Sequence, residues 1–189
     1  MRVSELFTSL QGEGYWTGTP SAFIRLAGCN LSCPFCDTDY SPRQDLSELQ
    51  VADWAGGTGL PHAVVTGGEP GLQLTPTLVA LLHERGLRVQ VETNGTIDLP
   101  PSWGIDWVTC SPKTLHPCLS HIDELKVVFT TPSDITPWEQ YPVPHRFVQP
   151  CDTGDPSANA RIVQAAVSYC LSHPQWRLSL QTHKLIGIH

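Results

Sequence analysis

The chain has 189 residues, 40% of them hydrophobic, with a formal net charge of −7 and a pI near 5.5. This length suits a single domain, residues 1–189, with a sizeable core. The negative charge argues against a general nucleic-acid or anionic-membrane surface, and no apolar run is long enough to cross a bilayer. Because the N-terminus also lacks a signal-peptide core, we expect a cytoplasmic protein whose seven cysteines are reduced.

Short apolar runs recur along the chain and predict β-strands, several of them covered on both faces. These runs span residues 3–8, 22–26, 63–66, 88–92, 107–109, 125–129, 146–149 and 177–180. Helices are expected between some of them. Ser47 with Gln50 resembles a capping box, Thr75 with Pro76 suits the start of a second helix, and 159–171 has apolar residues at helical spacing. The alternation predicts an α/β fold with a mostly parallel sheet, and too few helices are present for a complete eight-fold barrel, so a partial, shortened (β/α) barrel fits better.

Polar and glycine-rich motifs follow five of the predicted strands. TGGEP and ETNGT follow the third and fourth, and SPK, QPCD and QTHK follow later ones. In parallel α/β folds the carboxyl ends of the strands carry the chemistry. These motifs therefore predict a functional site at that edge of the sheet.

Three cysteines, Cys29, Cys33 and Cys36, lie within eight residues in the stretch GCNLSCPFCDTDY. Structural zinc usually takes four protein ligands, so a zinc site would need a distant cysteine or histidine as well. A disulfide would use two of the sulfurs and leave one over. A cubane iron–sulfur cluster held by three thiolates would leave one iron open to a small molecule.

The spacing C-x-x-x-C-x-x-C, together with TGGEP, resembles the radical S-adenosylmethionine superfamily. The resemblance implies a [4Fe-4S] cluster with three cysteine ligands, whose open iron chelates S-adenosylmethionine. In that superfamily one electron from the cluster cleaves the sulfonium and yields a 5′-deoxyadenosyl radical. The protein would supply binding, orientation and exclusion of water.

A more specific resemblance is to the 7-carboxy-7-deazaguanine synthase family, carried by FTSLQGEG, FIRLAGCNLSCPFCDTDY, TGGEP, ETNGT, SPK and LQTHK. Its members are lyases that convert 6-carboxy-5,6,7,8-tetrahydropterin to 7-carboxy-7-deazaguanine with loss of ammonia, on the route to queuosine. The resemblance implies a radical SAM partial barrel, a homodimer and an external one-electron reductant such as flavodoxin.

The resemblance also assigns residues by motif. The cluster ligands are Cys29, Cys33 and Cys36, and no protein side chain is assigned a catalytic role, because the radical forms on the cofactor. The residues expected to border S-adenosylmethionine are Phe35, Cys36, Asp37, Gly68, Ser111, Pro112, Lys113, Gln149, Pro150, Cys151 and Asp152, with Glu92 and Asn94 as weaker candidates. Those expected around the pterin are Leu10, Gln11, Gly12, Glu13, Arg25, Thr66, His183 and His189.

Thr38 is assigned by the same resemblance as a Mg²⁺ ligand next to the substrate carboxylate. Magnesium prefers oxygen and keeps several waters, so one neutral protein ligand can suffice when the substrate supplies others. The spacing alone favours a different role for Thr38, a cap of the turn that follows the cysteines.

Some parts of the chain stay outside this assignment. The interval between the first two cysteines is compact, whereas some family members have a longer insertion there, and 131–144 matches no known element. Lys126 is expected to contact the cofactor or to form a strand-end ion pair, and it is left outside the site. Two other functions remain open from the cysteine spacing, a glycyl-radical-activating enzyme that acts on a partner protein and a zinc-stabilised binding module.

Overall fold

The computed structural model describes residues 1–189, and all of its strands belong to one nine-stranded sheet of order β3-β1-β2-β4-β5-β6-β7-β8-β9. The strands are β1 (Arg2–Leu10), β2 (Pro20–Leu26), β3 (Gln44–Asp45), β4 (His62–Gly67), β5 (Arg88–Thr93), β6 (Trp107–Cys110), β7 (Glu124–Phe129), β8 (His145–Pro150) and β9 (Arg177–Leu178). The helices are α1 (Glu48–Gly57), α2 (Pro76–Glu84), α3 (Pro156–Ser172) and α4 (Thr182–Ile186), with 3₁₀ turns η1 (Pro70–Leu72), η2 (Pro101–Trp103), η3 (Pro132–Asp134) and η4 (Thr136–Trp138).

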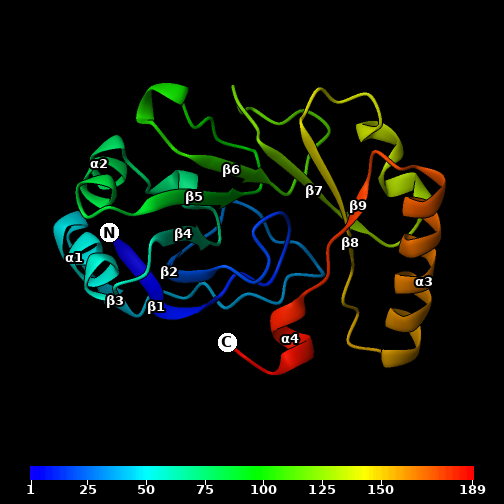
Figure 1. Ribbon diagram of the computed structural model, residues 1–189, viewed down its shortest axis with the longest axis horizontal. Helices are drawn as coiled ribbons and strands as arrows, with labels where there is room; N and C mark the ends of the chain where they lie inside the picture. The colour runs from blue at the N-terminus through cyan, green and yellow to red at the C-terminus, as the bar shows by residue number, and fades with distance from the viewer.

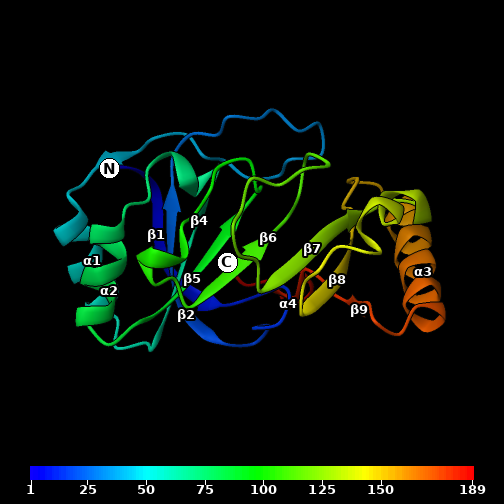
Figure 2. The same ribbon diagram turned by 90° about the horizontal axis from the view of Figure 1, so that it is seen from above.

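The sheet is parallel from β2 to β9, and only β1 pairs antiparallel, with β2 on one side and β3 on the other. It does not close, because β3 and β9 remain its two ends. Helices α1 and α2 cover the outside of one half and α3 covers the outside of the other, whereas α4 lies on the inner side (Figures 1 and 2). The predicted α/β partial barrel is confirmed.

The three longer helices begin where their sequences provide caps. Ser47 and Gln50 form the capping box of α1, and the Thr75 hydroxyl accepts a hydrogen bond from the Leu78 N–H at the start of α2. Helix α3 begins three residues before the predicted 159, because Asp155 caps it and a proline occupies its first turn.

The core lies between the sheet and the outer helices. Ile24, Val65 and Val91 on neighbouring strands are fully buried, and Leu78 and Leu82 of α2 pack into the same cluster. Burying each such side chain contributes about 1.5–3 kcal/mol relative to exposure. This packing fixes the strand ends that carry the polar motifs.

Two elements were not expected from the sequence, and the last strand is shorter than expected. β3 was not predicted, since it is a polar two-residue strand held only by pairing with β1. Helix α4 was not predicted either, and the strand expected over 177–180 ends at residue 178. In the unassigned 131–144, Ile135 and Trp138 are buried, so η3 and η4 pack against the core. No helix has both the length and the apolar character that a bilayer crossing needs.

Candidate active site

One cavity of about 620 Å³ opens along the carboxyl ends of the parallel strands. Its walls come from the ends of β1, β2, β4, β5 and β8, the interior of β7, the loops after β2 and β6, and the C-terminal segment around α4. All the site residues named from the sequence line it except Pro112, which is buried and does not reach it. The expectation that the strand-end motifs share one edge is therefore confirmed, while their individual roles remain proposals.

The three clustered cysteines occupy the loop between β2 and β3. Cys29 and Cys33 are half-buried, Cys36 is exposed, and none forms a disulfide. Gly28 closes the loop, because its N–H donates to the Tyr40 carbonyl at 2.9 Å and its φ of +85° suits glycine. No group of three or more His, Cys, Asp or Glu side chains lies close enough to hold a single metal ion.

The TGGEP turn presses directly on this loop. A Cβ on Gly68 would lie 2.2 Å from the Gly28 carbonyl oxygen, so only glycine allows the two backbones to approach this closely. Glu69 is fully buried and anchors the turn. Its carboxylate accepts hydrogen bonds from the Thr93 hydroxyl at 2.7 Å and from the Asn94 N–H at 2.8 Å, which joins the end of β4 to the end of β5.

Two further motifs reach the cysteine loop. The Asn94 side chain in ETNGT donates to the side-chain oxygen Oδ1 of Asn30 at 3.1 Å, and its Nδ2 lies 4.0 Å from the Cys29 sulfur. The Lys113 ammonium in SPK lies 5.8 Å from the centre of the Phe35 ring. Both contacts support the loop from the cavity side.

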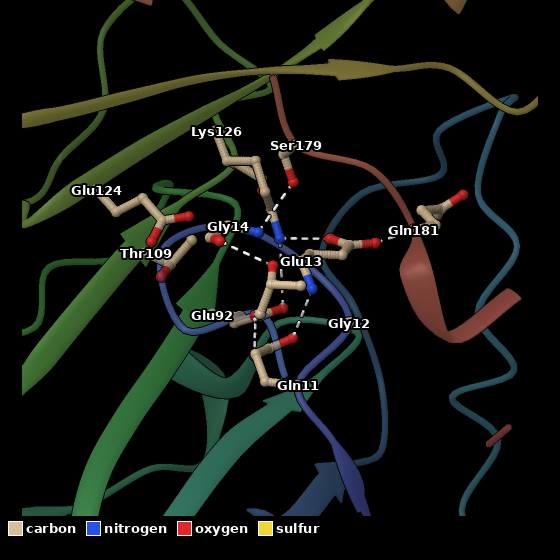
Figure 3. A network of polar contacts seen from close by, with 12 residues as sticks. Gln11, Gly12, Glu13, Gly14, Glu92, Thr109, Glu124, Lys126, Ser179 and Gln181 are labelled. Atoms are coloured by element: carbon tan, nitrogen blue, oxygen red, sulfur yellow. Dashed lines mark hydrogen bonds and ion pairs between the residues drawn. The ribbon is translucent and has the colours of Figure 1, made fainter. Parts of the chain in front are cut away.

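A buried polar network forms the floor of the cavity (Figure 3). Lys126 lies at its centre, with Nζ 2.5 Å from Glu13 Oε2 and 3.7 Å from Glu92 Oε2. Gln181 donates to Glu13 Oε1 at 3.0 Å, and Gln11 donates to Glu92 Oε1 at 2.9 Å. The network thus joins the LQGEG, ETNGT and QTHK motifs through one lysine that sequence reasoning left outside the site.

The charges of this network reinforce one another. Burial alone raises the pKa of Glu13, but the Lys126 ammonium and the hydrogen bonds from Lys126 and Gln181 more than offset it, so the pKa lies below its ordinary value. Burial lowers the pKa of Lys126, but Glu13, Glu92 and Glu124 raise it further, so the net shift is upward. At neutral pH Glu13 is therefore a carboxylate and Lys126 an ammonium.

The C-terminal segment closes one side of the cavity. Lys184 in α4 donates to Asp37 at 2.6 Å and to Asp152 at 2.9 Å, so it bridges the cysteine loop and the residues that follow β8. His183 packs so closely on Gly12 that a Cβ there would lie 2.0 Å from its Nδ1. The segment is therefore held to three parts of the cavity wall.

Arg25 and the last residue meet at another part of the wall. Glu5 accepts from Arg25 Nε at 3.3 Å and contacts His189 Nε2 at 2.7 Å. The Ser9 hydroxyl donates to the His189 carbonyl at 2.6 Å, and the His189 ring lies edge-on to Phe7, with centroids 4.2 Å apart. These contacts bring the chain end beside the guanidinium group.

Comparison with known proteins identifies the family of this chain. Residues 23–123 match the radical SAM superfamily. The chain is 44% identical over 188 residues to 7-carboxy-7-deazaguanine synthase of Bacteroides thetaiotaomicron, covering 99% of this chain and 98% of that one. It is 41% identical over 218 residues to the synthase of Caulobacter vibrioides, covering 98% of each. The chain belongs to the 7-carboxy-7-deazaguanine synthase family. The crystal structure of QueE from Escherichia coli superimposes with a TM-score of 0.78 at 29% identity, covering 96% of this chain and 94% of that one.

Membership of the 7-carboxy-7-deazaguanine synthase family and of the radical SAM superfamily implies a [4Fe-4S] cluster and S-adenosylmethionine, and the cavity fits both. Three unpaired thiols lie on its wall in one loop, as a cluster with three thiolate ligands requires. Gln149 lines the same cavity and is 6% exposed, yet its Oε1 has no hydrogen-bond partner. A buried acceptor left unpaired at this point fits a site that a polar ligand completes.

The alternative role of Thr38, as a turn cap, is not what the structure shows. Asp39 caps this turn instead, because its Oδ1 accepts from the Ser41 N–H at 2.9 Å. Thr38 is half-buried and lines the cavity of this synthase-family chain. Its hydroxyl is thus available to a ligand.

Several residues that build the site were missed by sequence reasoning. Gln181 and Lys184 stand inside QTHK, so the motif itself was the signal for them. Glu5 lies on β1, where its spacing to Arg25 gives no hint of pairing. For Lys126 the only signal was a charged residue within the apolar run LKVVF, which is unusual for a buried parallel strand.

Proposed function

We propose that this chain is a 7-carboxy-7-deazaguanine synthase, which converts 6-carboxy-5,6,7,8-tetrahydropterin to 7-carboxy-7-deazaguanine with loss of ammonia. The observation that carries this proposal is the convergence of the cysteine loop, TGGEP, LQGEG and QTHK on one cavity, in a chain alignable over its full length with synthases. Bound cluster and S-adenosylmethionine supply the 5′-deoxyadenosyl radical that starts the reaction.

Cys29, Cys33 and Cys36 hold the cluster in this proposal. The cysteine loop, the TGGEP turn and the end of β8 would hold S-adenosylmethionine between them, and Gln149 offers it an unpaired side-chain oxygen. Residues on these walls orient the cofactor, and the half-enclosed cavity limits water around the reacting atoms. The proposed cofactor contacts are Phe35, Asp37, Gly68, Ser111, Lys113, Gln149, Pro150, Cys151 and Asp152, and Pro112 supports its turn from a buried position.

The pterin occupies the floor of the cavity. A pterin ring presents an amino group and a ring N–H side by side, and the ionised Glu13 carboxylate can accept from both. Arg25 binds the substrate carboxylate in a bidentate fork and shares its guanidinium group with Glu5. Further pterin contacts are proposed for Leu10, Gln11, Gly12, Thr66, His183 and His189.

The Thr38 hydroxyl would hold a Mg²⁺ ion, which the substrate carboxylate and water would also bind. A Mg²⁺ ion there would neutralise the carboxylate and fix its orientation. The position of Thr38 on the cavity wall supports this role. Replacing Thr38 by valine is expected to raise the Mg²⁺ concentration needed for half-maximal activity.

The remaining expectations belong to the same proposal. The chain acts as a single domain within a homodimer and takes its electron from an external protein such as flavodoxin. Reduced thiol ligands favour the cytoplasm. A glycyl-radical-activating enzyme and a zinc-stabilised module are not favoured, because the relatives that match the full length are synthases.

Turnover by Arg25 variants tests the pterin assignment. Arg25→Ala should lower kcat/KM for the pterin by about 10–100-fold, since a charge-assisted hydrogen-bond pair contributes about 1.5–3 kcal/mol. Arg25→Lys keeps the charge but loses the bidentate fork, so its kcat/KM should lie between those of the wild type and Arg25→Ala. Arg85→Ala, which removes an ion pair to Asp53 on the outer helices, is the matched control. A wild-type protein that cleaves S-adenosylmethionine without consuming the pterin would overturn the proposal.

A further inference from the structure

Lys126 is a buried cation in β7, where it lies between the apolar residues Leu125 and Val127. Its side chain is 5% exposed and points from β7 to the cavity floor, where carboxylates surround it (Figure 3). Glu13 comes from the loop after β1, Glu92 from β5, and Glu124 from β7 itself. Burying an ammonium group is costly unless it is paired, so this lysine is compensated by groups from three parts of the fold.

Stability alone does not explain the arrangement. A buried ion pair is often no more stabilising than apolar side chains of similar volume. The Glu13 carboxylate receives one hydrogen bond on each oxygen, from Lys126 and from Gln181. Each oxygen keeps a second acceptor position, and Glu13 lines the cavity. The pair thus presents an ionised double acceptor to the space above it.

We propose that Lys126 is a positioning residue of the reaction, which acts through Glu13 by keeping that carboxylate ionised and oriented for the two adjacent donors of the pterin ring. This inference rests on the proposed function. A protonated Glu13 would have to turn an O–H toward ring donors and would lose one acceptor position. Lys126 therefore determines both the affinity for a 2-amino-4-oxo ring and the pH range over which that affinity persists.

The surrounding charges give the sign of the effect. Burial raises the pKa of Glu13, and Lys126 on β7 and His183 on α4 oppose it. Lys126 itself faces Glu92, Glu124 and the like charge of Lys113 on the loop after β6. Without Lys126 the burial effect prevails and the pKa of Glu13 rises. Pterin affinity should then fall as the pH is lowered through the new pKa.

The test measures kcat and KM for the pterin between about pH 6 and pH 9 with reconstituted holoenzyme. Wild-type KM should stay nearly constant over this range. Lys126→Met should raise KM at least 10-fold more at the acid end than at the alkaline end. Lys126→Arg should restore the flat profile, and the control Arg85→Met should leave it unchanged.

The double variant Lys126→Met/Glu13→Gln identifies the titrating group. It should bind the pterin weakly at every pH, and its KM should lack the extra rise at acid pH, the acid limb, that the single variant shows. An acid limb that persists there would assign the titration to Glu92 or Glu124 and overturn the inference, as would a flat profile for Lys126→Met. If Lys126→Met does not fold, Lys126→Met/Glu92→Gln removes one unbalanced carboxylate and should show the same acid limb; its absence there counts against the inference.

Two outcomes separate this inference from the proposed function. If the wild type cleaves S-adenosylmethionine and leaves the pterin unchanged, both fail. If the wild type converts the pterin and Lys126→Met loses only thermal stability or kcat, equally at all pH values, Lys126 has a structural role and only this inference fails.

Discussion

Gly68→Ala is expected to damage the cysteine loop through a single methyl group. The added Cβ would lie 2.2 Å from the Gly28 carbonyl oxygen and 2.7 Å from the Cys29 Cβ, whereas ordinary contact begins at 3.4 Å. The loop must therefore retreat by about 1 Å, because backbone atoms cannot rotate away as a side chain can. That retreat also breaks the hydrogen bond from the Glu69 N–H to the Gly28 carbonyl, which spans 2.9 Å.

The expected cost is about 1–3 kcal/mol, the range for overpacking a close contact. For a chain of this size it corresponds to a fall in Tm of about 2–12 °C in the apoprotein. Because Cys29 moves with the loop, the affinity for the cluster should fall by about 10-fold or more. Thermal unfolding and iron and sulfide analysis after reconstitution measure the two effects.

Gly57→Ala is the matched control for this substitution. Gly57 ends α1 with no atom within 4 Å of an added Cβ. The change should leave the iron content unchanged and raise or preserve Tm, since alanine is favoured over glycine in a helix. If Gly68→Ala matched this control in both Tm and iron content, the close approach described above would be wrong.

Three further substitutions or labels test other contacts. Glu69→Gln turns one acceptor into a donor beside a backbone N–H, so the free energy of unfolding should fall by about 1–3 kcal/mol in denaturant titrations, and a value equal to wild type would contradict the anchoring role. Lys184→Met removes both bridges of α4, and hydrogen exchange in the last residues should become faster; unchanged exchange would mean that other contacts hold the segment. Burial raises the pKa of Cys110 to about 12, so iodoacetamide at about pH 8 should label exposed Cys118 in the folded apoprotein and spare Cys110; equal labelling would refute this.

The parts of the fold and site that follow local rules were predictable. The caps at Ser47 and Thr75 mark the two helix starts correctly, because they depend on residues a few positions away. The strand-end motifs meet in one cavity, because parallel strands align their carboxyl ends. TGGEP was predicted at this edge from its place after a strand, and there Gly68 allows a close approach of two backbones and Glu69 anchors the turn.

Contacts between distant segments could not be predicted from the pattern alone. Lys126 meets a carboxylate 113 positions away and Lys184 meets one 147 positions away, and nothing in the local sequence indicates either partner. β3 carries no apolar alternation, and α4 has no side-chain cap, so tertiary contacts rather than propensity determine both. The motifs at the centre of the site could therefore be recognised in the sequence, but the hydrogen bonds and ion pairs that join them could not.

Anaerobic turnover tests the central claim most directly. Reconstituted protein, S-adenosylmethionine, Mg²⁺, a reductant and 6-carboxytetrahydropterin are mixed, and the products are identified by mass. The account predicts 7-carboxy-7-deazaguanine from the wild type and none from Cys33→Ala. Formation of 5′-deoxyadenosine without that product would contradict the synthase assignment, and a folded protein that neither assembles a cluster nor cleaves S-adenosylmethionine would contradict the radical chemistry as well.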